Sequence, residues 1–276
     1  MVQATLAALR DCLACPGSTA AGGGVSTLVQ RRIVCPACRA VFAAEVVTGL
    51  HATRMPELRE AILAGRLHRF ECPECAQPIV LHDRTFVYTD FDRFHWFVVY
   101  PEDGVRHRGE LTAKVLEGYD SVMRRDCPPL VREQWAPRFL VRAVFGLASL
   151  REKLILLDQG FDDRLIEVYK LQLFRDGHVG PFSPAARLWC EGLDGDELLF
   201  VNISPPGPEG TCVTRAFAVH RSGYDLLAAD PEPARRGFPA AFGGVMADWR
   251  AAVTGDLPLP SDIDLTEQPR LDPPLR

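Results

Sequence analysis

Four cysteines of the 276-residue chain occur in two matching Cys-Pro-x-Cys hooks, one in RRIVCPACRAVF and one in HRFECPECAQPI. A Cys-x-x-Cys turn directs two sulfur atoms at one point, about 2.3 Å from each, and the proline stiffens the turn. Two hooks supply four thiolates, the ligand set that structural zinc prefers in closed tetrahedral sites. We therefore predict one structural Zn²⁺ per chain, bound by Cys35, Cys38, Cys72 and Cys75.

Paired cysteines could instead serve redox chemistry, in which the thiolates react and do not bind a metal. A redox Cys-x-x-Cys motif normally opens a helix in a thioredoxin-like unit. Strand-forming residues follow both hooks here, AVFAAEVV after the first and PIVL after the second. The sequence therefore favours structural zinc over redox-active thiols or cysteines without a role.

A third pair, Cys12 and Cys15, competes for the first hook. The spacing from Cys15 to Cys35 alone fits a short zinc ribbon. However, a glycine-rich stretch, PGSTAAGGGVST, fills most of that interval in place of a hairpin, and the pair lacks the internal proline of the hooks. We therefore favour the two hooks and expect free thiols, or a second partial metal site, at Cys12 and Cys15.

Other residues could also bind the metal. His68 and His82 flank the second hook and could substitute as ligands. Because four cysteines already complete the site, we expect both histidines to be strand residues beside it. Cys127, Cys190 and Cys212 stand alone, and an isolated cysteine is by default a small core residue.

The segment HDRTFVYTDFDRFHW concentrates carboxylates and histidines that could perform acid–base chemistry. On a strand, Tyr88, Asp90 and Asp92 alternate onto one face, where they could act with His82 or His95 or bind a second cation. The simpler interpretation, which we favour, is a solvated strand face or a turn with internal ion pairs. The sequence contains no phosphate loop, nucleophile elbow, dinucleotide fingerprint or zinc-hydrolase signature. We therefore predict no catalytic residue and favour a protein without catalytic activity.

The elements that position the hooks divide the chain into four regions. We predict a flexible N-terminal segment over residues 1–27, a β-rich zinc-ribbon-like domain with a helical insertion over 28–137, a mixed α/β C-terminal domain over 138–256, and a Pro-rich tail over 257–276. The expected fold class is therefore α+β. A chain with 47% hydrophobic and 24% charged residues can bury cores of this size.

A predicted helix between the hooks allows two distant pairs of cysteines to meet. Pro56 suits the first turn of a helix, Glu57 suits the positive end of its dipole, and Gly65 suits its end. Thr53 is a candidate N-cap. The strands expected around this helix are 28–34, 40–47, 66–71, 78–81, 85–89 and 94–100.

In the C-terminal region, the sequence pattern predicts two helices, a hairpin that turns in GLDGDE, a strand with a short helix, and a terminal helix in FGGVMADWRAAVTGD. The second of the two helices begins at Asp162 or Asp163 and ends at Gly177. Helix capping and an i, i+3 pair between Glu167 and Lys170 account for its charges without any chemistry.

Several of these stretches, in this order, resemble the bacterial CpXC-domain family, which is named for two Cys-Pro-x-Cys motifs. The resemblance covers about Leu28 to Asp176 and rests on CPAC, PELREAILAGRLHRFECPEC, FVYTDFDR and FGLASLREKLILLDQGFDDRLIEVYKL. It implies that the four hook cysteines bind the metal, and it implies no activity. Such proteins commonly have a glycine after each hook, where this chain has Arg39 and Ala76. Glycine at these positions permits a positive φ.

Composition narrows the classes of function. The net charge of −5 gives no overall attraction to nucleic acid or to an anionic membrane surface. The apolar stretch FLVRAVFGLASLREKLILL is interrupted by Arg142, Arg151 and Lys153, so no membrane span is expected. Nine cysteines, an odd number with four in matched pairs, favour a reducing cytoplasm over a disulfide framework.

These features favour a zinc-stabilised cytoplasmic adaptor or assembly module that binds another protein. The aromatic side chains of Phe91, Phe94, Trp96 and Phe97 are candidates for part of that interface.

Two alternatives stay open. Zinc ribbons often bind nucleic acid, and Arg31, Arg32 and Arg39 surround the first hook. The second alternative is an enzyme whose carboxylate/His site lies outside the zinc cluster, at Asp90 and Asp92 or in the C-terminal domain.

Overall fold

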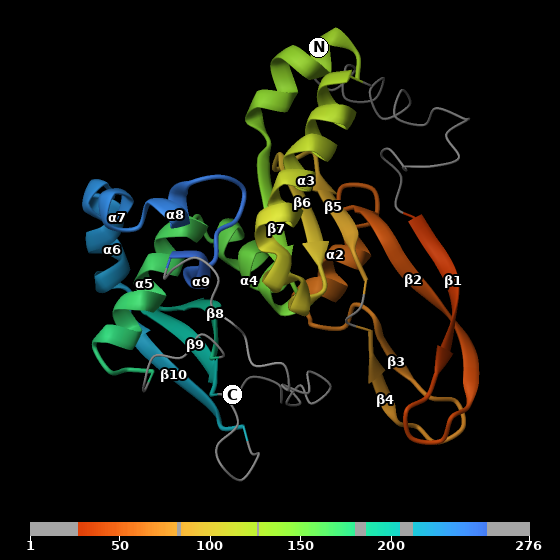
Figure 1. Cartoon of the computed structure of the whole chain (residues 1–276). Coiled ribbons are helices and arrows are strands. Elements are labelled where there is room, and N and C mark those ends of the chain that lie inside the picture. Colours follow the sequence, from red (N-terminus) through yellow and green to blue (C-terminus); the bar gives the residue numbers. More distant parts are fainter. Residues whose placement is uncertain (1–26, 82–83, 126, 180–185, 205–211, 253–276) are drawn as a thin grey trace. The chain divides into compact units, whose positions relative to one another are not determined.

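The computed structural model describes residues 27–81, 84–125, 127–179, 186–204 and 212–252 (Figure 1). The chain forms two compact units that divide between Leu150 and Arg151. The expectations for residues 1–26 and 257–276, including those for Cys12 and Cys15, lie outside the described residues, as does His82.

A five-stranded sheet forms the centre of the first unit (Figure 1). The strands of this unit are β1 (Thr27–Val34), β2 (Val41–His51), β3 (Arg69–Glu71), β4 (Pro78–Val80), β5 (Phe86–Asp90), β6 (His95–Tyr100) and β7 (Leu140–Phe145). The large sheet has the order β1-β2-β5-β6-β7, and β3 pairs with β4. Pairing is antiparallel for β1–β2 and β5–β6, and parallel for β2–β5 and β6–β7. Each strand expected between residues 28 and 100 is present.

The alternation of buried side chains explains how these strands share a core. Leu50 of β2 lies opposite Tyr88 of β5, and Tyr88 lies opposite Phe97 of β6. All three are buried, as expected for residues on one face of neighbouring strands. Parallel strands need a crossover, and residues 52–85 supply one between β2 and β5, which contains the β3–β4 hairpin.

The helix expected in this crossover is α2 (Pro56–Leu63). Pro56 and Glu57 occupy its first turn, and Gly65 follows its end with a left-handed φ of 63°, as predicted. The prediction of Thr53 as N-cap is wrong. The N-cap is Met55, whose side chain makes no capping hydrogen bond, and Pro56 follows it at the first helical position, where an amide hydrogen is not needed.

Helix α3 (Arg108–Asp120) is not predicted by the sequence pattern. Only Val115 and Tyr119 are buried on it, so its apolar stripe is narrow. Tyr119 stacks edge-on against Trp96 and donates a hydrogen bond to the carbonyl oxygen of Ala136 (2.6 Å). Tertiary contacts, more than local amphipathicity, therefore define this helix.

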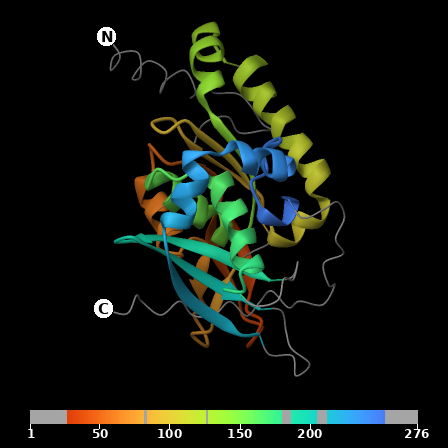
Figure 2. The same ribbon diagram turned by 90° about the vertical axis from the view of Figure 1, so that its left-hand side faces the viewer.

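The second unit contains a three-stranded antiparallel sheet and several helices (Figure 2). Its strands β8 (Arg187–Asp194), β9 (Glu197–Ile203) and β10 (Thr214–His220) have the order β10-β9-β8. Helix α4 (Leu147–Asp158) crosses the boundary between the units. The other helices are α5 (Asp163–Arg175), α6 (Ser222–Ala229), α7 (Glu232–Gly237), α8 (Pro239–Phe242) and α9 (Trp249–Ala252).

Helix α5 covers one face of this small sheet and forms as the sequence predicts. The side chain of Asp162 caps it by accepting a hydrogen bond from the amide of Arg164 (2.8 Å), and Gly177 follows its end with a φ of 78°. Tyr169 packs against Phe200 of β9, with ring centroids 6.3 Å apart. The hairpin predicted to turn in GLDGDE is the β8–β9 pair.

The terminal helix starts later than expected. Two glycines, Gly243 and Gly244, follow α8, and the next helical residue is Trp249.

The mixed α/β character predicted for the chain is confirmed. Among the helices of the described ranges, none is both long and apolar enough to cross a membrane.

Candidate metal centre

Each Cys-Pro-x-Cys hook closes a β-hairpin of the first unit. The first hook joins β1 to β2, with Val34 opposite Val41, and the second joins β3 to β4, with Glu71 opposite Pro78. Because each hairpin fixes both ends of its hook, the direction of the cysteines is set by strand pairing.

The two hooks have the same backbone hydrogen bonds. In the first, the amide of Cys35 donates to the carbonyl of Ala40 (2.8 Å), and the amide of Arg39 donates to the carbonyl of Cys35 (3.0 Å). The second hook repeats both bonds at the equivalent positions, with lengths of 3.0 and 2.9 Å. The repeated sequence therefore folds into a repeated local structure.

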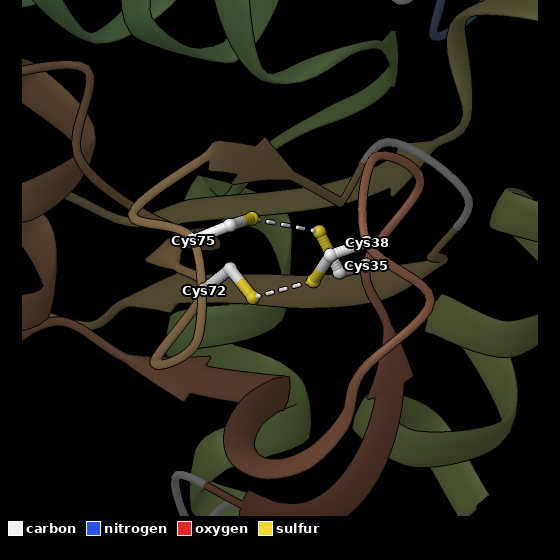
Figure 3. A group of neighbouring side chains, drawn as sticks. All are labelled: Cys35, Cys38, Cys72 and Cys75. Carbon is white, nitrogen blue, oxygen red and sulfur yellow. Dashed lines mark hydrogen bonds between the residues drawn. The ribbon is translucent and has the colours of Figure 1, made fainter.

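The hooks bring their four sulfur atoms together (Figure 3). All four lie within 4.8 Å of one another. The bonded pairs in Figure 3 take one cysteine from each hook: Cys35 Sγ lies 3.7 Å from Cys75 Sγ, and Cys38 Sγ lies 3.5 Å from Cys72 Sγ. A tetrahedron with metal–sulfur bonds of about 2.3 Å has edges of about 3.8 Å. The four cysteines, none of which forms a disulfide, could therefore bind one metal ion together.

One side of the cluster is apolar and the other is open. Cys35 and Cys72, the first cysteine of each hook, are buried with Ile33 and Ile79 in a small hydrophobic cluster. The second cysteines, Cys38 and Cys75, are exposed. The cluster thus lies at the surface but rests on packed side chains.

The residue after each hook has a left-handed backbone. Arg39 has a φ of 65° and Ala76 has a φ of 57°, a conformation that glycine adopts without strain and other residues adopt at a cost. These are the two positions where the family resemblance implies glycine. Arg39 and Ala76 thus have the backbone conformation that glycine would adopt most easily at these positions.

Deprotonating all four neighbouring thiols costs free energy when no cation is bound, because the thiolates repel one another. A hydrogen bond from the amide of Cys38, with smaller contributions from the amide of Ala37 and from the sulfurs of Cys38 and Cys72, lowers the pKa of Cys35 to about 6. Burial acts in the opposite direction but is outweighed. The amide of Gln77 also lowers the pKa of Cys75, but the sulfur of Cys38, burial and the remaining sulfurs outweigh it and raise that pKa to about 12. A cation bound among the sulfurs would remove this repulsion, since it stabilises every thiolate.

Four thiolates around one metal fill a tetrahedral coordination sphere. Such a site leaves no coordination position for water or substrate, so it stabilises a fold and does not activate a nucleophile. The donor set and its geometry therefore fit a structural metal ion.

His68 lies close to this part of the fold but has a different role. Its buried Nε2 accepts a hydrogen bond from the amide of Val47 (3.1 Å), and its ring contacts Phe86 edge-on with centroids 5.8 Å apart. The nitrogen is thus engaged in linking the residues before β3 to β2. This agrees with the expectation of a neighbour of the site, not a ligand, but the expected strand position is wrong, because His68 lies in the turn before β3 with a φ of 58°.

The three isolated cysteines divide into two groups. Cys127 and Cys190 are buried in hydrophobic clusters, one in each unit, as predicted. Cys212 is exposed, so the prediction of a core position is wrong there. The residues just before it lie outside the described ranges.

The carboxylate segment forms a turn. Asp90, buried at the end of β5, accepts hydrogen bonds at Oδ1 from the amides of Asp92 and Arg93 (3.1 Å each). Its Oδ2 lies 3.2 Å from Nη1 of Arg93 and 3.4 Å from the hydroxyl of Tyr88. Asp92 lies beyond the strand and is exposed, so Tyr88, Asp90 and Asp92 do not share one strand face. A turn with internal ion pairs, the interpretation favoured from the sequence, is confirmed.

The aromatic residues around this turn pack inside the first unit. Trp96 and Phe97 are buried, and His95 stacks on Phe97 with ring centroids 5.1 Å apart. Phe91 and Phe94 are partly buried against the cluster that contains Phe139. Trp96 and Phe97 therefore belong to the core, and Phe91 and Phe94 pack against it while staying partly exposed.

The second unit contains a buried ionic cluster whose extent the sequence does not predict. Lys170 Nζ lies 2.7 Å from Glu152 Oε1 and 3.1 Å from Glu167 Oε1, and Lys153 Nζ lies 2.8 Å from Glu167 Oε1 and 3.5 Å from Asp163 Oδ2. The expected Glu167–Lys170 pair is confirmed, but it lies in the interior, where charges must be paired.

Backbone amides complete this ionic cluster. The amide of Cys190 donates to Glu152 Oε1 (2.6 Å), and the amide of Trp249 donates to Glu167 Oε2 (3.0 Å). Burial raises the pKa of Glu152 to about 7. The cluster thus joins α4, α5, β8 and the start of α9, which are distant in sequence.

Two β-hairpins with matching cysteine hooks, the first of them part of a mixed five-stranded sheet, define a protein with a candidate four-cysteine metal centre. A family model described as CpXC protein matches residues 33–170, half of the chain, and includes all four cysteines. The chain belongs to the CpXC family, as the resemblance of its motifs predicts. The search of curated proteins gave no match, and neither did the search of solved structures.

Proposed function

We propose that this chain is a zinc-stabilised adaptor or assembly module that binds another protein, and that its metal stabilises the fold without catalysing a reaction. The observation that carries the proposal is the closed set of four sulfur atoms, all within 4.8 Å of one another, at the tips of two hairpins. The position of each half-site on its own hairpin supports a zinc-ribbon-like module as part of this proposal.

Zinc is the ion that suits these ligands best. Four thiolates in a tetrahedral arrangement select Zn²⁺ or iron, and hard cations such as Mg²⁺ prefer oxygen ligands. Seven cysteines of the described ranges are free of disulfides, which supports a reducing compartment such as the cytoplasm.

Elemental analysis of the purified full-length chain tests the metal. We expect about one zinc per chain, and loss of that zinc in the paired variant Cys35→Ser/Cys72→Ser. Cys212→Ser, at an exposed cysteine outside the cluster, is the matched control and keeps the metal. Full zinc occupancy in the paired variant would overturn the ligand set.

Affinity capture of the full-length chain from its native cells, with chemical cross-linking, tests the binding role. We expect a protein partner in stable ratio with the chain, and loss of that partner when the zinc ligands are replaced. A strictly monomeric chain without partners in sedimentation and capture experiments would overturn the adaptor proposal.

A nucleic-acid-binding role is the second candidate, because three arginines lie exposed around the first hook. Within the described part of the chain, Arg31, Arg32 and Arg39 form no ion pair. Binding through them would show a salt-dependent shift in a gel assay with generic DNA or RNA. No shift at low salt would remove this candidate.

A further inference from the structure

We propose that the free edge of β1 binds an extended segment of a partner protein as an added strand, and that this segment carries two adjacent acidic residues. The inference rests on the proposed function and names the chemistry of the partner. Three features of the described residues carry it: a sheet face on which no other element packs, a strand edge with no neighbouring strand, and two arginines that form no ion pair.

One face of the β1–β2 hairpin, here called the open face, has no packing against it in the described structure. Its side chains are those of Leu28, Gln30, Arg32 and Val34 on β1 and of Val41, Ala43 and Glu45 on β2. All seven are exposed. The opposite face is different, since Ile33, Phe42 and Ala44 pack in the hydrophobic cluster behind the hooks.

The open face contains apolar side chains that water solvates poorly. Val34 and Val41 lie directly opposite each other and are 54% and 49% exposed, and Leu28 is 41% exposed. They are three of the seven large apolar residues exposed in the described ranges. Apolar side chains gathered on one exposed face often mark a binding surface.

The edge of β1 can also accept a new strand. β1 is the first strand of its sheet, so one side of it has no neighbouring strand among the described residues. The amide of Cys35 bonds to the carbonyl of Ala40, just before β2, so in the antiparallel pattern every second residue before Cys35 also bonds to β2. The residues between them turn their amides and carbonyls to the free edge: Leu28, Gln30, Arg32 and Val34.

Charge identifies the occupant of this edge. Arg31 and Arg32 lie opposite Ala44 and Ala43, so neither arginine has an acidic residue directly opposite it on β2. Glu45, the acidic residue of the open face, accepts a hydrogen bond from Gln30 (3.2 Å). An added strand with acidic residues opposite both arginines would supply the missing cross-strand pairs, each of which stabilises a sheet.

A second copy of this chain fits the edge less well. β1 reads TLVQRRIV and contains no acidic residue, so pairing β1 with itself leaves all arginines without an opposite charge. In-register pairing places like charges against each other, which destabilises a sheet. Nucleic acid has the right charge, but it cannot continue the hydrogen-bond ladder of the edge, and the net charge of the chain is −5.

The register predicts the partner sequence. Read antiparallel from Val34 to Leu28, the added segment has an apolar residue opposite Val34, acidic residues opposite Arg32 and Arg31, and an apolar residue opposite Leu28. The pattern is apolar-x-acidic-acidic-x-x-apolar. Main-chain bonds provide affinity in this mode of recognition, and alternate side chains provide specificity.

Two synthetic peptides test the proposal on the metal-loaded full-length chain. The first, TVTEETTVT, follows the pattern, and the second, TVTKKTTVT, replaces both acidic residues by lysine. Titrations followed by ¹⁵N NMR should show shifts in β1 residues and at least about tenfold tighter binding of the glutamate peptide, because two attractive pairs replace two repulsive ones.

Charge reversal provides the decisive variant. Arg31→Glu/Arg32→Glu should invert the preference, so that the lysine peptide binds more tightly than the glutamate peptide. Arg215→Glu, at an exposed arginine on β10, is the matched control and should leave both affinities unchanged. Gln30→Pro removes an amide at the free edge, where proline is tolerated, and should abolish binding of either peptide.

Several results would overturn the proposal: equal or no binding of the two peptides, shifts outside β1, peptide binding that survives Gln30→Pro, dimerisation through β1, or binding of DNA or RNA alone. The proposed function fails separately. If a captured partner binds the β1 variants as well as the wild type, only the proposal for the β1 edge is wrong. If β1 binds the peptides but no partner is captured, the adaptor role is wrong.

Discussion

Arg39 and Ala76 occupy the same position in the two hooks and share the same left-handed backbone conformation. Two residues with unrelated side chains thus share one strained backbone conformation. The reason is that the amide of each residue donates a hydrogen bond to the carbonyl of the first cysteine of its hook. The geometry of the metal site is therefore set by the hook and not by the residue that follows it.

This strain predicts a stabilising substitution. Ala76→Gly should raise the free energy of unfolding by about 0.5–1 kcal/mol, since glycine relieves the left-handed strain and costs some chain entropy. Denaturant unfolding at a fixed metal concentration measures the change. Ala37→Gly, inside the first hook at a residue without a positive φ, is the control and should lower the stability. Equal effects of the two substitutions would contradict this account.

His68→Ala should separate a structural role from a ligand role. The change leaves the buried amide of Val47 without its acceptor, which costs about 1–3 kcal/mol of stability. The zinc content should stay at the wild-type value. Loss of the metal together with the imidazole would show that His68 is a ligand after all.

Lys170→Met should be among the most destabilising changes in the second unit. It removes one of two ammonium groups that face three carboxylates in the buried ionic cluster, and unpaired buried charges cost about 3–5 kcal/mol. Thermal unfolding checks the loss. Lys114→Met, at an exposed lysine paired with Glu110, should leave the melting temperature nearly unchanged.

Glu152 should make stability depend on pH with a definite sign. Burial raises its pKa from the ordinary value of 4.5 to about 7 in the folded chain, so the folded state binds the proton more tightly than the unfolded state. This contribution to the free energy of unfolding is fully present below about pH 4.5 and is lost as pH rises to about 7. Comparing wild type with Glu152→Gln across this range isolates it, and an unchanged slope in the variant would refute the assignment.

The candidate site could be predicted from sequence because its signal is local. Each hook is four residues long, the flanking strands have β-branched residues, and Pro56 and Gly65 mark the helix between them. What the sequence does not provide is the pairing of the two hooks in space. Their repeated local geometry made that pairing the simplest expectation, and the four gathered sulfurs agree with it.

The remaining features depend on contacts between distant residues. Lys153 and Lys170 look like ordinary surface lysines in the sequence, but carboxylates from α4 and α5 and the amides of Cys190 and Trp249 fold around them. Helix α3 has too narrow an apolar stripe to be recognised alone. The sequence leaves open whether the strand continues from Asp90 to Asp92 or turns there, and the structure shows that Asp90 ends the strand by accepting two amides of the turn.

Each close pair of sulfur atoms takes one cysteine from each hook, and this pairing has a consequence for the unfolded chain. Because Cys35 approaches Cys75 and Cys38 approaches Cys72, neither hairpin can complete the coordination sphere alone. A bound ion would tie residues 35–38 to residues 72–75 and close the loop between them, like a covalent cross-link that a chelator can open. By the chain-entropy relation for disulfides, such a closure removes about 4 kcal/mol of conformational freedom from the denatured ensemble. Metal availability would then control how often this chain unfolds.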